Sequence, residues 1–90
     1  MADIQVEAAG EETYRVRVEE AGGASEHTVT VPADQLERYG GGVGAEELVE
    51  ESFRFLLERE PKEAILSRFD LSTIEGYFPE YAEEIRARVG

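Results

Sequence analysis

The sequence contains no cysteine, so it can form neither a disulfide framework nor a metal site built on thiolates. It also has no run of about 18 apolar residues, which a membrane-spanning helix would need. The first residues lack both the basic and the apolar region of a signal peptide. These absences argue against a membrane span and against a signal peptide still present, and they favour a cytoplasmic protein.

Basic residues are also scarce, because 9 lysines and arginines stand against 21 acids and give a formal net charge of -12. Lys62 is the only lysine. Such a surface repels nucleic acid and anionic membranes over a Debye length of roughly 8 Å, and it favours a basic protein partner. Binding to nucleic acid or to a membrane is therefore not expected.

The chain of 90 residues is long enough for one domain, and a hydrophobic fraction of 41% indicates a real core. A chain of this length buries only about 60–65% of the surface that its unfolded form exposes. A monomer would therefore be modestly stable, and homodimerisation would add apolar burial.

Residues 3–32 are expected to form three strands, because their apolar residues recur at every second position. Turn signals at Gly10 and at residues 20–25 separate the three runs, and Pro32 ends the third. The prediction is a three-stranded antiparallel meander. The residues expected to face the core are Ile4, Val6, Ala8, Tyr14, Val16, Val18, His27, Val29 and Val31.

A long amphipathic helix is expected at Ala45–Glu60, because the apolar residues share one broad face at helical spacing. A short helix at residues 33–39 and a glycine-rich loop at residues 40–44 precede it. Pro61 ends the long helix, and its fixed backbone angle suits the first turn of a short helix at Lys62–Arg68.

The last third of the chain should hold two further helices. Asp70 is the expected cap of the first, and Ser72 with Glu75 forms a competing capping box. The second should begin near Pro79, with acids in its first turn and arginines in its last.

The predicted fold class is α+β, with a three-stranded antiparallel meander followed by a C-terminal group of three to four helices. Residues 1–90 form a single domain. Within it, residues 3–32 make the β meander, residues 33–44 the short helix and the glycine-rich loop, and residues 45–90 the helical part.

Residues suited to catalysis or metal binding occur without the partners that they would need. His27 is the only histidine, and a lone imidazole on the inward face of a strand is usually a packing residue. The loop ending at Gly44 lacks the third glycine of a dinucleotide-binding motif, and Glu46 and Glu47 would oppose a bound phosphate. We therefore predict that the protein is not an enzyme, and that it has no catalytic residues, no metal-binding residues and no cofactor.

Residues 64–78 resemble the helix-turn-helix pattern of bacterial regulators, with Ala64 in the first helix, Phe69 five positions later and Asp70 as a cap. The resemblance implies a recognition helix that begins near residues 71–73 and faces a DNA major groove. The alternative is a tight corner of two helices used for packing. The absence of arginine and lysine from the implied recognition face favours this alternative.

Residues 51–81 also resemble the core of small uncharacterised bacterial proteins, and this resemblance implies no activity or site. The expected function is a non-enzymatic acidic interaction or regulatory module, whose partner is a protein, with a basic one favoured, or a second copy of the chain. The alternative function is a DNA-associated or antitoxin-like regulator that uses a helix-turn-helix near residues 62–78. The candidate partner-binding residues are Ser72, Thr73, Tyr77, Phe78 and Tyr81.

Overall fold

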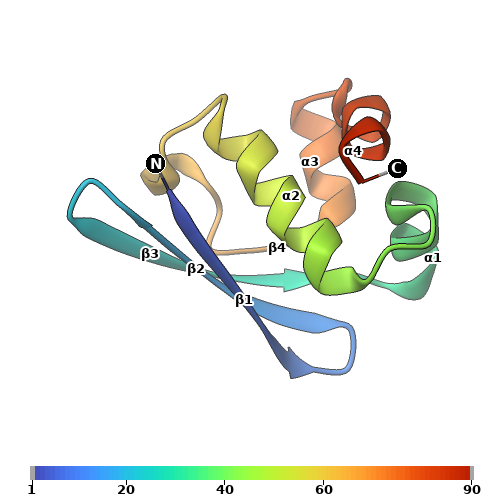
Figure 1. The fold of residues 1–90 in the computed structure, drawn as a ribbon, viewed down its shortest axis with the longest axis horizontal. Coiled ribbons are helices and arrows are strands. Elements are labelled where there is room, and N and C mark those ends of the chain that lie inside the picture. Colours follow the sequence, from blue (N-terminus) through green and yellow to red (C-terminus); the bar gives the residue numbers. More distant parts are fainter. Residues whose placement is uncertain (1, 90) are drawn as a thin grey trace.

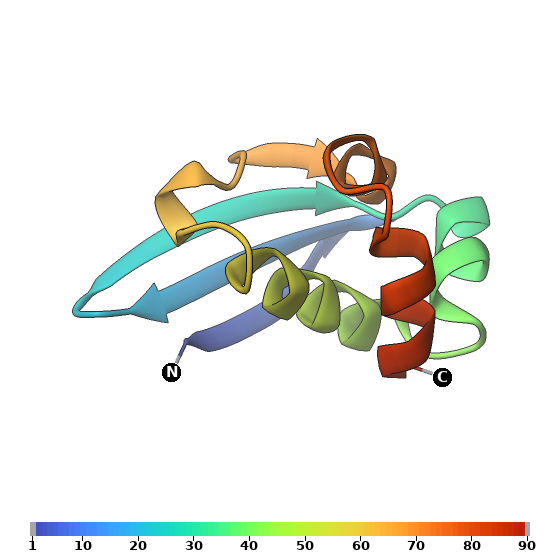
Figure 2. The ribbon, with the colours of Figure 1, turned by 90° about the horizontal axis from the view of Figure 1, so that it is seen from above.

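A computed structural model describes residues 2–89 of the chain. Its elements, in chain order, are β1 (Asp3–Gly10), β2 (Thr13–Glu20), β3 (Gly23–Thr30), α1 (Ala33–Gln35) with a π-helical turn (Leu36–Gly40), α2 (Ala45–Leu57), a 3-10 turn (Lys62–Ala64), β4 (Arg68–Asp70), α3 (Leu71–Tyr77) and α4 (Tyr81–Val89). The fold is α+β, and α2 lies across one face of a four-stranded sheet with the order β1-β2-β3-β4 (Figures 1 and 2).

The N-terminal meander is confirmed. β1 pairs antiparallel with β2, and β2 pairs antiparallel with β3, so that Val16 lies opposite Val6 on one side and His27 on the other. The expected alternation buries Val16 and His27 beneath the helices. Ala8 is exposed instead of facing the core, because the β1–β2 hairpin extends away from α2 (Figure 1).

The segment Lys62–Arg68 was expected to be a helix, but it is not one, and its last residue begins a fourth strand, β4. This segment makes a single 3-10 turn and then runs extended, and β4 pairs parallel with β3, placing Phe69 opposite Val29. The Thr28 N–H also donates to the Ser67 carbonyl at 2.8 Å. A helix this short is marginal on its own. The pairing of β4 with β3 and the burial of Phe69 therefore outweigh the helical preference of this segment. The sheet is therefore mixed and not purely antiparallel.

α2 is the central helix that the apolar pattern predicted, although it ends at Leu57 and not at Glu60. The Glu60 N–H still donates to the Leu56 carbonyl at 2.8 Å, which holds the chain in a last turn before Pro61. The apolar face of α2 packs on the sheet and, at its side, on α4. Its buried residues are Leu48, Val49, Ser52, Phe53, Phe55 and Leu56.

The helices are not all C-terminal, because α1 and the π-helical turn precede the glycine-rich loop. Tyr39 of that turn is fully buried, and its ring centroid lies 5.0 Å from that of Tyr81 at the start of α4. This contact places the π-helical turn next to α4 at one end of α2 (Figure 2). Within residues 2–89, no helix has the length and apolar character that crossing a membrane requires.

Candidate partner-binding groove

An apolar groove of about 150 Å³ lies between the end of α2, the segment that leads into β4, and α3. α2 and β4 supply buried walls, since Leu56 and Phe69 belong to the hydrophobic core. The groove therefore opens the core to the surface at this place. Its lining residues are Leu56, Glu60, Ala64, Ile65, Leu66, Phe69, Thr73, Ile74, Tyr77 and Phe78.

Two large apolar side chains of the groove lining are exposed. Leu66 is 46% exposed and Tyr77 is 66% exposed, and no other large hydrophobic residue within 2–89 is exposed. Leu66 precedes β4 and Tyr77 ends α3, so the two come from different elements and meet at one groove. Exposed apolar side chains are ordinary when they are scattered, whereas these two lie at one apolar groove.

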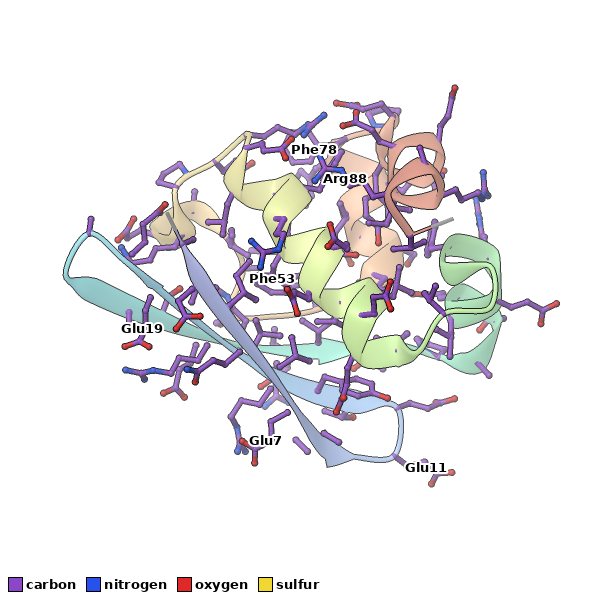
Figure 3. The ribbon with its side chains drawn as sticks, in the orientation of Figure 1. Glu7, Glu11, Glu19, Phe53, Phe78 and Arg88 are labelled. Carbon is purple, nitrogen blue, oxygen red and sulfur yellow. The ribbon has the colours of Figure 1, made fainter. Side chains whose placement is uncertain are left out.

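His27 fixes the backbone at the groove rim. Its Nδ1 lies 2.7 Å from the Leu66 carbonyl, and its Nε2 lies 2.8 Å from the Ser25 hydroxyl. Because a carbonyl only accepts, Nδ1 donates to it, and in the neutral imidazole the Ser25 hydroxyl then donates to Nε2. The ring packs 5.2 Å from Phe53, which Figure 3 shows on α2. His27 is therefore a satisfied packing residue that ties Leu66 to the sheet.

Among the described residues that line the groove, Glu60 is the only charged one. It is partly buried, and no basic nitrogen of the described residues lies within 4.0 Å of its carboxylate. The nearest cations along the chain are already paired, since Arg59 binds Glu84 at 2.9 Å and Lys62 binds Glu63 at 2.8 Å. The hydrogen bond from Lys62 lowers the pKa of the Glu63 carboxyl, as expected for an engaged pair.

Three of the predicted partner-binding residues, Thr73, Tyr77 and Phe78, come together in the groove. Phe78 packs edge-on against Phe55 of α2, with ring centroids 5.9 Å apart. In Figure 3 it lies on the side of the molecule opposite the labelled glutamates of the meander. Tyr81 does not belong to this set, because it is fully buried and its hydroxyl is 2.7 Å from that of Ser52.

Ser72 is exposed but lies outside the groove, where it supports the start of α3. The Asp70 carboxylate accepts hydrogen bonds from the Ser72 hydroxyl at 2.6 Å and from the Thr73 N–H at 3.2 Å. Asp70 is thus the N-cap, and the competing cap at Ser72 is not formed. Ser72 has a structural role here that explains its residue type.

The segment that resembles a helix-turn-helix does not contain two helices. Where the pattern places its first helix, the chain forms the 3-10 turn and then β4, so a corner of two packed helices is not formed either. Sequence reasoning missed Leu66 and Phe69 as groove residues because it placed them in or beside this helix. The sequence offered no signal for Leu66, because it directly follows the apolar Ile65 and fits the pattern of a helix.

The described residues contain no cluster of three or more histidine, cysteine, aspartate or glutamate side chains arranged to hold a metal ion. Comparisons with protein-family models, with curated proteins and with solved structures find no match to this chain.

Proposed function

We propose that this protein is a non-enzymatic interaction module that binds an apolar side chain of a partner protein in the groove between α2, β4 and α3. The observation that carries the proposal is the meeting of Leu66 and Tyr77, both exposed, at one groove that leads into the core. Binding energy in protein interfaces concentrates on such apolar anchors seated in pockets.

The size of the groove supports an anchor and not a small-molecule substrate. Pockets for drug-sized ligands measure about 300–1,000 Å³, whereas this groove measures about 150 Å³. An apolar cavity of roughly this size accommodates a benzene molecule, which has the dimensions of a phenylalanine ring. One leucine or phenylalanine side chain of a partner therefore matches the space.

The charge of the chain favours a different protein over a second copy. Each copy carries a net charge of -12, so two copies joined through this face would repel one another. The DNA-associated alternative has less support, because a 3-10 turn and an extended segment that leads into β4 take the place of the first helix of its motif. The implied recognition face also has no basic residue.

A random peptide library displayed on phage tests the proposal. Selection on the full chain should enrich peptides that share a leucine or an aromatic residue. A selected peptide should lose at least about tenfold in affinity for the doubly substituted variant Leu66→Ser with Tyr77→Ser. Both side chains are exposed, so the variant should fold, and its urea unfolding curve serves as the control.

Two results would contradict the proposal. One is that no peptide is enriched over a selection without protein. The other is that the selected peptides bind the double variant as tightly as the unmodified chain. Sedimentation of the free protein shows whether a second copy of the chain, and not a foreign partner, fills the groove. A dimer that the two substitutions dissociate would identify the second copy as the occupant.

A further inference from the structure

We infer that the groove recognises a cationic residue of the partner beside the apolar anchor, and that the Glu60 carboxylate pairs with this cation. This inference rests on the proposed function and adds the chemistry of the partner. Its occupant is a protein segment with one large apolar side chain and an arginine or a lysine close to it in sequence.

Glu60 contributes a carboxylate to the lining of the groove. Every other lining residue is apolar or uncharged, so a partner that fills the groove meets one charge there. The Glu60 backbone is fixed by its hydrogen bond to the Leu56 carbonyl at 2.8 Å, which places the side chain at the end of α2. A partly buried carboxylate in an apolar lining gains more from a cation than a fully solvated one does.

Glu60 forms no ion pair with a basic side chain of residues 2–89. Arg59 reaches away to Glu80 and Glu84 of the α4 side, at 3.3 and 2.9 Å, and its guanidinium stacks 3.7 Å from the Phe55 ring centroid. Lys62 is buried and pairs with Glu63. Among the described residues, the two cations nearest to Glu60 in sequence are thus paired with other carboxylates.

Electrostatic complementarity also acts over a longer range than the groove itself. An acidic surface of net charge -12 accelerates encounters with a basic segment and disfavours an acidic one. That general attraction does not choose a position along the partner. A single charge beside the groove selects one position, because it fixes the spacing between the cation and the apolar anchor in the partner sequence.

A charge exchange tests the inference with peptides from the same phage library. Peptides selected on the unmodified chain should carry arginine or lysine at a constant spacing from the anchor. Replacing that cation by glutamate should weaken binding by about fivefold. For Glu60→Lys the order should reverse, so that the glutamate peptide binds more tightly than its parent.

Glu51→Lys is the matched control. Glu51 is also a partly buried glutamate of the α2 region without an ion pair among the described residues, but it does not line the groove. Both variants change the net charge equally, so only Glu60→Lys should invert the preference. The neutral variant Glu60→Gln should abolish the preference and flatten the salt dependence of binding, and it covers the case in which Glu60→Lys fails to fold.

The outcomes separate the two proposals. Equal effects of Glu51→Lys and Glu60→Lys, or selected peptides without a positioned cation, would overturn the role of Glu60 and leave the groove as an apolar site. A library that yields no binding peptide at all would remove the proposed function, and the role of Glu60 with it.

Discussion

The hydroxyls of Ser52 and Tyr81 lie 2.7 Å apart, and both side chains are fully buried where α2 meets α4. The Ser52 hydroxyl donates to the Leu48 carbonyl at 2.7 Å, so its proton is used and Tyr81 must be the donor between the two. Tyr81 is therefore an internal link between helices, which explains why it is not on a binding surface.

This hydrogen bond predicts a strongly non-additive pair of substitutions. Ser52→Ala leaves the Tyr81 hydroxyl buried without a partner and should lower the free energy of unfolding by about 1–3 kcal/mol. Tyr81→Phe should cost about 1 kcal/mol, because Ser52 keeps its bond to Leu48. The double variant should cost clearly less than the sum in urea unfolding, and a simple sum would contradict the assigned bond.

Tyr39 should make the protein sensitive to alkaline pH. Burial, together with a hydrogen bond to the Glu75 carboxylate at 2.7 Å, raises the pKa of Tyr39 to about 12, whereas an unfolded tyrosine has a pKa of about 10. The folded state holds this proton more tightly, so its contribution to stability is complete below about pH 10 and is lost as the pH rises towards about 12.

The test of Tyr39 is the slope of the unfolding free energy against pH in that window. Tyr39→Phe should reduce the downward slope by up to about 1.4 kcal/mol per pH unit. Part of the slope should remain, because burial raises the pKa of Tyr81 as well. Tyr77→Phe, at an exposed tyrosine, is the control for the removal of a phenolic hydroxyl as such.

Arg59 should not tolerate lysine, although the charge is the same. Its guanidinium bridges Glu80 and Glu84 while it stacks on the Phe55 ring, and it also donates to the Phe55 carbonyl at 3.2 Å. One ammonium group cannot reproduce this planar set of contacts. Arg59→Lys should therefore lower the unfolding free energy by roughly 0.5–1 kcal/mol.

The matched control for Arg59 is Arg17→Lys. Arg17 also pairs with two glutamates, Glu19 and Glu26, but all three side chains are exposed on the sheet. Its substitution should change the unfolding free energy by less than the error of the measurement. If both arginines tolerate lysine equally, the contacts of Arg59 do not hold α2 to α4.

The meander could be predicted because its signal is local. Alternation at every second residue, with turns at Gly10 and after Glu20, places Val16 and Val18 on the buried face without knowledge of the helices. The cap at Asp70 was local as well, because the residue that it caps lies three positions away. Patterns of this range are read from the sequence alone.

β4 and the groove could not be predicted, since both depend on residues far apart in the chain. A strand of three residues is too short to show a periodic pattern. β4 forms because Phe69 pairs with Val29 of the neighbouring strand β3. The same placement exposes Leu66 and brings it to the groove that Tyr77 lines. Sequence reasoning could mark Tyr77 as a candidate, but it could not pair Tyr77 with Leu66.

His27 should connect the stability of the sheet to the shape of the groove. Its Nδ1–H holds the Leu66 carbonyl at 2.7 Å, across 39 positions of sequence, while the Leu66 side chain lines the groove. His27→Phe keeps an aromatic ring against Phe53 but removes both ring hydrogen bonds. It leaves the Leu66 carbonyl unpaired and should cost about 1–3 kcal/mol of unfolding free energy.

A substitution that only weakened the core would lower stability without changing the groove. Loss of the His27 bond should instead release the segment before β4, which hydrogen exchange would show as faster exchange of the Thr28 amide, the donor to Ser67. A groove-binding peptide should then bind about three- to fivefold more weakly under conditions where the variant is fully folded. Ser25→Ala keeps the Leu66 bond and should leave both readouts unchanged. If His27→Phe lowers stability but leaves both the exchange of the Thr28 amide and peptide binding unchanged, His27 only packs in the core and does not position the groove.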